Sequence, residues 1–152
     1  MANTTEDTIS TLNNLITTCK DGEEGYREAA TGVTSSEMKD LFIRYSQQRG
    51  QFAGELQDEV RKLGGEPTNS TSIASSLHRG WINLKSAVTG QDEASVLNTV
   101  EEGEDVARDA YLDAQKQPLP QDVLSVIERQ YMQVREAYER IRNLRNMANA
   151  AS

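Results

Sequence analysis

The chain has 152 residues, about the length of one ordinary domain, and a formal net charge of −8 at pH 7. Its single cysteine excludes an internal disulfide and fits a reducing compartment, and no run of about 18 apolar residues is present to span a membrane. The acidic balance argues against a nucleic-acid-binding protein, and no charged and then apolar segment opens the chain as in a signal peptide, so a cytoplasmic location is expected.

Apolar residues recur at every third or fourth position between the prolines and glycines, and no long alternating run is found. This pattern predicts an all-α chain. The first helix is expected from about Thr4 to Ala30. Asn3 and Glu6 have the spacing of a capping box at its start, in which each side chain satisfies a free backbone N–H.

A second long helix is expected from about Ser35 to Leu63. Thr34 and Glu37 repeat the capping-box spacing at its start. Gly64 and Gly65 follow it, and a glycine there ends a helix because it readily adopts the left-handed conformation.

Three further helices are predicted in the second half of the chain. The first is shorter and covers about Ser72 to Val88. Asp92 is expected to be the N-cap of a helix from about Glu93 to Gln115. The last helix is expected from about Pro120 to Met147, with Pro120 in its first turn.

Four of these helices have similar lengths, so we expect them to pack lengthwise as a bundle. The shorter helix lies in sequence between the second and third long ones, where it would carry the chain back along the bundle. Residues 1–152 are therefore predicted to form a single helical-bundle domain.

Charged residues interrupt three of the apolar stripes. Glu23, Arg49 and Glu104 each project among the apolar residues of their helix. They predict a buried polar cluster, because a charged side chain is rarely buried without a partner. The tyrosines expected beside them are Tyr26, Tyr111 and Tyr131. In the alternative interpretation, the charged side chains reach the bundle edge and the tyrosines only fill the core.

Four segments together resemble an uncharacterised bacterial family, a domain of unknown function with a ferritin-like four-helix bundle. These segments are residues 19–30 (CKDGEEGYREAA), 48–56 (QRGQFAGEL), 63–67 (LGGEP) and 77–81 (LHRGW). The family is distantly similar to di-iron proteins of the bacterioferritin and rubrerythrin type. The resemblance implies a ferritin-like fold, to which the predicted short crossover helix is an addition, and it implies no activity.

Ferritin-like di-iron proteins hold their metals with a Glu from each of two helices and a Glu-x-x-His from each of the other two. Where the resemblance places the first such pair, this chain has Arg49 and Phe52. The last helix offers Glu128 with Tyr131, so both histidines are replaced. Glu104 with Tyr111 keeps a Glu-x6-Tyr spacing similar to that of bacterioferritin-like helices.

His78 is the only histidine in the chain. It lies in the predicted crossover helix, far from the carboxylates. We expect it to be a surface or packing residue beside Trp81 and not a metal ligand.

Three functions follow from these residues. The favoured one is a non-catalytic bundle, in a stress or storage setting, in which Arg49 takes the electrostatic place of the metal and bridges carboxylates. It has no catalytic residue and no cofactor. The first alternative is a protein that binds Fe or Mn through Glu23, Glu104 and Glu128 for oxidative chemistry or storage. The second is a small-molecule binder that uses the glycine-lined interior.

A homo-oligomer is expected, and a dimer is favoured. Met38, Phe42 and the broad apolar faces present more apolar surface than one bundle covers. No nucleic acid and no membrane are expected as partners.

Overall fold

The structure, a computed structural model, describes residues 4–68, 80–90 and 92–151. Within these ranges the chain is made of helices and connecting turns and contains no strand, so the prediction of an all-α chain is confirmed. The helices in chain order are α1 (Thr5–Ala29), the 3-10 helix η1 (Ala30–Gly32), α2 (Ser36–Lys62), α3 (Leu84–Gly90), α4 (Glu93–Gln115) and α5 (Gln121–Ala151).

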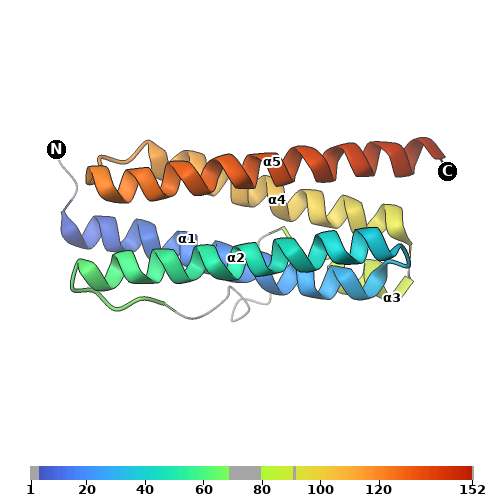
Figure 1. Cartoon of the computed structure of the whole chain (residues 1–152), viewed down its shortest axis with the longest axis horizontal. Helices are drawn as coiled ribbons and strands as arrows, with labels where there is room; N and C mark the ends of the chain where they lie inside the picture. Colours follow the sequence, from blue (N-terminus) through green and yellow to red (C-terminus); the bar gives the residue numbers. More distant parts are fainter. Residues whose placement is uncertain (1–3, 69–79, 91, 152) are drawn as a thin grey trace.

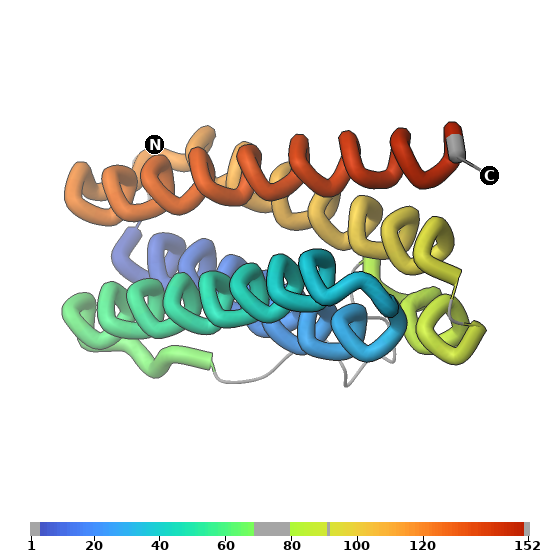
Figure 2. Tube along the Cα trace, turned by 45° about the vertical axis from the view of Figure 1, so that its right-hand side comes forward, coloured from blue at the N-terminus to red at the C-terminus, as the bar shows by residue number. Residues whose placement is uncertain are grey.

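The four long helices lie side by side along the long axis of the molecule (Figure 1). Helices α1 and α5 run in one direction, and α2 and α4 run in the other (Figures 1 and 2). Because α2 ends and α4 begins at opposite ends of the molecule, the connection between them spans its length. Helix α1 packs on α2 and on α4, and α4 packs on α5.

The starts of the first two helices differ from the prediction by one residue. The capping box of α1 is formed by Thr4 and Asp7 and not by the predicted pair of Asn3 and Glu6; Asn3 lies outside the described residues. The N-cap of α2 is Ser35, whose side chain accepts from the N–H of Met38. At each of these two starts, adjacent residues are both suitable caps, so the sequence allows the helix to begin at either of two neighbouring positions.

Thr34 does not cap α2 because it binds elsewhere. Its N–H and its hydroxyl donate to the carboxylate of Glu93 at 3.0 and 3.1 Å. These bonds lower the pKa of Glu93 and tie the turn between α1 and α2 to the start of α4.

The predicted end of α2 and the predicted start of α4 are confirmed, whereas both ends of α5 differ from the prediction. Gly64 follows α2 with a φ of 79°, and the side chain of Asp92 caps α4 by accepting from Ala94. Pro120 lies just before α5 instead of in its first turn, and its carbonyl accepts from the N–H of Leu124. Helix α5 continues to Ala151, beyond the predicted end.

The predicted crossover helix is wrong in extent. Helix α3 has seven residues, Leu84–Gly90, and residues 81–83 form a turn before it. Gly80 has a φ of +88°, a conformation that stops a right-handed helix there. Residues 69–79, including His78, lie outside the described residues.

Two apolar clusters form the core of the bundle. The first includes Leu12, Leu56 and Ile127, and the second includes Phe42, Leu97 and Ile141. Arg49 and Glu104 are buried between them and belong to neither cluster.

Phe42 is fully buried and Met38 is partly buried against the second cluster. The bundle itself therefore covers Phe42, which offers no apolar surface to a second copy. The dimer stays a prediction. None of the helices in the described residues is both long enough and apolar enough to cross a membrane.

Candidate functional site: a buried arginine–glutamate pair

A bidentate ion pair lies in the middle of the bundle. Arg49 projects from α2 and Glu104 from α4, and their side chains are 1% and 0% exposed. The guanidinium donates from Nη1 to Oε1 at 2.5 Å and from Nη2 to Oε2 at 2.7 Å. The fork of the guanidinium therefore satisfies both oxygens of the carboxylate, which is the geometry expected of a strong buried pair.

The hydroxyl of Tyr26, on α1, donates to Oε2 of Glu104. Burial, followed by the nearby carboxylate, raises the pKa of Tyr26 well above its usual value, so its proton stays in place. Burial alone would lower the pKa of Arg49, but Glu104 overrides it and raises that pKa. Helices α1, α2 and α4 thus meet at one carboxylate.

On the α1 side, the arginine packs against Gly22. A Cβ added to Gly22 would lie 3.4 Å from both Cγ and Nη1 of Arg49, about the distance of an ordinary van der Waals contact. The arginine also keeps a bond to its own helix, where its Nε donates to the side chain of Gln48 at 3.2 Å.

A second chain of polar side chains is built around Tyr111, seven residues after Glu104 on α4. The hydroxyl of Tyr111 donates to Oε1 of Gln130 at 2.7 Å, and Sγ of Cys19 lies 3.1 Å from the same hydroxyl. Because the tyrosine proton is used for Gln130, the thiol is left to donate to the tyrosine oxygen. Burial raises the pKa of Cys19 to about 11 and also raises the pKa of Tyr111, which keeps both groups protonated.

Gln130 connects this chain to the surface. Its side-chain nitrogen donates to the carbonyl of Phe52 at 3.3 Å and to Oε1 of Glu55 at 3.0 Å. Glu55 in turn accepts from Arg129 at 2.7 Å.

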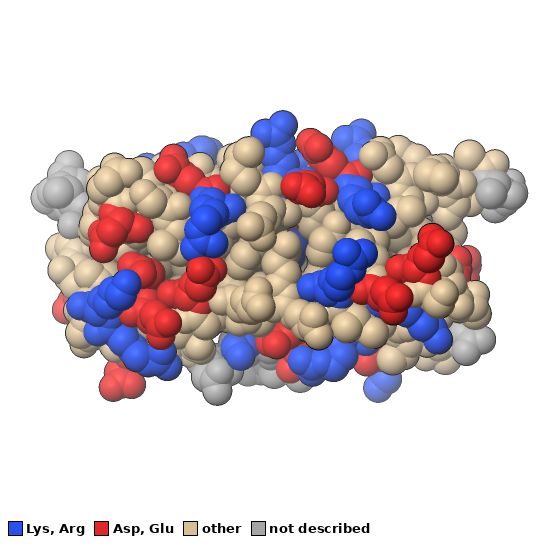
Figure 3. Space-filling view, in the orientation of Figure 1, with Lys and Arg blue, Asp and Glu red and all other residues tan. Residues whose placement is uncertain are grey.

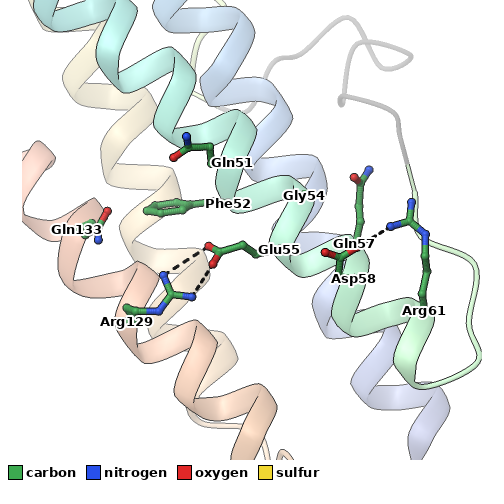
Figure 4. A pocket seen from close by; sticks show the side chains of 9 residues that line it. All are labelled: Gln51, Phe52, Gly54, Glu55, Gln57, Asp58, Arg61, Arg129 and Gln133. Atoms are coloured by element: carbon green, nitrogen blue, oxygen red, sulfur yellow. Dashed lines mark hydrogen bonds and ion pairs between the residues drawn. The ribbon is translucent and has the colours of Figure 1, made fainter.

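Glu55 and Arg129 lie in a groove of about 530 Å³ between α2 and α5. Figure 4 shows their paired side chains bridging the two helices, with Phe52 beside them. Hydrogen bonds therefore run from the buried thiol of Cys19 to an open groove.

Glu23 does not join the pair, although the stripe pattern placed it there. Its side chain is 25% exposed and lies 3.8 Å from Lys20 and from Arg27 of the same helix. A Cβ added to Gly50 would meet Oε2 of Glu23 at 2.5 Å, which places this carboxylate against the α2 backbone. Glu23 thus reaches the edge of the bundle, as the alternative interpretation described.

Of the remaining predicted site residues, two tyrosines are fully buried and the other two residues are not. Tyr26 and Tyr111 are fully buried in the two polar chains. Tyr131 is partly buried and packs against the first apolar cluster. Glu128 is exposed on α5.

Among the described residues, the carboxylates predicted as metal ligands do not form a site that fits a metal. Both oxygens of Glu104 are engaged by Arg49, and Glu128 faces solvent. In the part of the chain that the structure describes, no three His, Cys, Asp or Glu residues lie close enough to hold an ion. The set Glu23, Glu104 and Glu128 is therefore not brought together.

Gln130 was not among the predicted site residues. It lies three residues after Ile127 and four before Val134, both of which are fully buried. A polar residue at that spacing on an apolar stripe is the same signal that marked Arg49 and Glu104. Cys19 and Gln130 are thus additional members of the buried polar layer.

The fold and the site together define an all-α bundle with a buried, hydrogen-bonded ion pair at its centre. Residues 7–117 match the family described as Domain of unknown function (DUF2383), and the chain belongs to that family. The match covers α1 to α4 and ends before α5. A search of curated proteins finds no match to the chain.

Proposed function

We propose that this chain is a ferritin-like four-helix bundle in which a guanidinium replaces the metal ions, and that it works by association instead of catalysis. The course of the chain supports the ferritin-like relationship. Two helical hairpins, α1–α2 and α4–α5, are joined by one connection that spans the molecule. One such long crossover is the connection typical of ferritin-like bundles.

The observation that carries the proposal is the bidentate pair of Arg49 and Glu104. A guanidinium brings a permanent positive charge and several donors, so it neutralises a buried carboxylate as a metal ion would. The hydroxyl of Tyr26 completes the shell around that carboxylate. No cofactor is then needed to stabilise the core.

The charge distribution supports the part of the proposal that excludes binding to nucleic acid or to an anionic membrane surface. Acidic and basic side chains are interspersed over the face seen in Figure 3 and do not form a field of one sign. With a net charge of −8, long-range attraction to phosphate is unfavourable. We propose a cytoplasmic location, a stress or storage setting and a homodimer, for which the exposed side chains of Ile43, Met132 and Met147 provide apolar surface.

Metal analysis tests the first part of the proposal. Protein purified without chelators is incubated with Fe(II) or Mn(II), desalted and analysed by mass spectrometry of the elements. We expect no stoichiometric metal. Stoichiometric metal that is lost in Glu104→Gln and kept in Glu139→Gln, a control at a carboxylate that is 60% exposed and outside the predicted ligand set, would overturn the proposal, because the core would then be a metal site.

Sedimentation velocity over a wide concentration range tests association. We expect a concentration-dependent dimer. A chain that stays monomeric throughout would contradict the homodimer, and the association would then have to involve a different partner.

A further inference from the structure

Trp81 is seated in a slot between α1 and α4. Its side chain is 4% exposed, and a glycine lies on each of these two helices where the indole contacts it. A Cβ added to Gly25 would lie 2.4 Å from Cε3 of the indole, and one added to Gly103 would lie 2.2 Å from Cε2. Only glycine at both positions leaves room for the flat ring.

A third glycine, Gly80, allows the backbone just before Trp81 to lie close to α4. Gly80 has a φ of +88°, and a Cβ there would lie 2.7 Å from the carbonyl oxygen of Glu102 and 2.9 Å from Cα of Gly103. Glycine in a helix interior is unfavourable, so Gly25 and Gly103 weaken their helices while they admit Trp81. The slot is therefore built around this side chain.

The indole separates a surface hollow from the buried ion pair. On its outer side, Trp81, Gly25 and Ile82 line a hollow of about 390 Å³. On its inner side, the ring of Tyr26 meets the indole edge to face, with centroids 5.4 Å apart. The hydroxyl of Tyr26 donates to Glu104, so the side chain of Tyr26 connects the indole to the carboxylate.

We propose that Trp81 is a plug that keeps water from the Arg49–Glu104 pair, and that the seating of the plug and the integrity of the pair depend on each other. When the indole leaves, the slot opens to the hollow and water reaches Tyr26 and the carboxylate. When the pair is broken, Tyr26 loses its fixed position and the indole loses its inner wall. The empty slot takes a planar aromatic molecule of the indole class.

The first experiment empties the slot in the full chain. Trp81→Gly is expected to have a clearly lower melting temperature than the neighbouring control Ile82→Ala, because Ile82 is 52% exposed. Added indole is expected to raise the melting temperature of Trp81→Gly and not that of Ile82→Ala. Octahydroindole, which is similar in size but not planar, is expected to have little effect.

The second experiment leaves the plug in place and does not depend on the folding of Trp81→Gly. Trp81 is the only tryptophan, so its fluorescence reports on the slot alone. We expect little acrylamide quenching in the unmodified protein and several-fold stronger quenching in Glu104→Gln. Glu23→Gln, which alters a carboxylate outside the pair, is the matched control and is expected to resemble the unmodified protein.

Two results would overturn the proposal. One is equal quenching in Glu104→Gln and Glu23→Gln, which would show that the plug does not depend on the pair. The other is a folded Trp81→Gly that is as stable as Ile82→Ala or gains nothing from indole.

Discussion

Arg49 and Glu104 each make the burial of the other possible. Moving either charge out of water costs several kcal/mol, and their attraction offsets this cost only when the geometry is good and the remaining polar atoms are bonded. Both conditions hold here, since the pair is bidentate and Tyr26 binds one carboxylate oxygen. The pair is therefore expected to contribute little net stability while it is intact and to cost much when it is half removed.

Arg49→Leu is expected to lower the free energy of unfolding by about 3–5 kcal/mol, because it leaves Glu104 buried and unpaired. Arg49→Leu with Glu104→Leu is expected to cost much less than the sum of the two single changes, because no charge is stranded. Urea denaturation of the four proteins measures this coupling.

Arg49→Leu with Glu23→Gln is the matched control for this cycle. Glu23 is partly exposed and already lies near Lys20 and Arg27, so neutralising it should not rescue Arg49→Leu. Additive effects of the changes at Arg49 and Glu104 would contradict the account given for the pair.

Cys19 gives a prediction for the dependence of stability on pH. Its pKa is raised by burial from 9.0 to about 11 in the folded chain, so the folded state holds the thiol proton more tightly than the unfolded state. The resulting stability is fully present below the unfolded pKa and is lost as the pH rises toward 11. Between pH 8 and pH 10 the loss due to this group is about 1 kcal/mol.

Chemical denaturation across this pH range, on the unmodified chain and on Cys19→Ala, measures the effect. The stability of Cys19→Ala is expected to fall less steeply with pH, although Tyr26 and Tyr111, whose pKa values are also raised, contribute to both proteins. Identical slopes would contradict the prediction.

At the residue scale, the helical period was enough to find Arg49 and Glu104 but not to place Glu23. All three fall on apolar stripes. The side chain of Glu23, however, lies against the α2 backbone at Gly50 and near Lys20 and Arg27 of its own helix. The direction of a long side chain depends on its neighbours on the adjacent helix. A stripe on one helix holds no information about those neighbours.

At the scale of the elements, two glycines within helices show how the effect of an alanine substitution on stability depends on packing as well as on backbone entropy. A Cβ at Gly54 of α2 would have no neighbour within 4 Å, whereas a Cβ at Gly103 of α4 would lie 2.2 Å from the indole of Trp81. The same substitution is therefore expected to have opposite effects at the two positions.

Gly54→Ala is expected to stabilise the chain by about 0.5–1 kcal/mol, because alanine favours the helix and nothing obstructs it. Gly103→Ala is expected to destabilise it by about 1–3 kcal/mol, because the ring must move. Thermal and urea denaturation measure both changes. Destabilisation by Gly54→Ala would show that this position is packed against something in solution.

The helices were more predictable than their connections. The start of α4 at Glu93 followed from the N-cap Asp92, because capping is local. The crossover was not predictable, since the conformation of Gly80 depends on its contact with Glu102 and Gly103 of another helix. The bonds from Thr34 to Glu93 join residues 59 positions apart and left no local signal.

At the scale of the whole molecule, α5 is part of the core although it lies outside the matched family segment. Among its residues of described burial, up to residue 150, the buried ones are Val123, Ile127, Gln130, Val134, Ala137, Tyr138 and Ile141. Removing α5 would expose the apolar faces of α4 and α2 that these residues cover.

A chain that ends at residue 117 is therefore expected not to fold as a stable monomer, because its core would be open on one side. Circular dichroism is expected to show reduced helicity or aggregation. A synthetic peptide of residues 118–152, added in trans, is expected to restore cooperative unfolding, and a peptide with Val134→Asp is the control. A truncated chain that unfolds cooperatively by itself would contradict this view.

The position of the ion pair also fixes how the two helical hairpins align. Arg49 belongs to the α1–α2 hairpin and Glu104 to the α4–α5 hairpin. Apolar helices can slide past one another by one turn, about 5.4 Å, and still bury most of the same surface. In this chain such a slip would part the guanidinium from the carboxylate and leave two buried charges without partners. The pair thus selects one register for the assembly of the two hairpins. The neighbouring apolar contacts alone would not distinguish this register from one shifted by a helical turn.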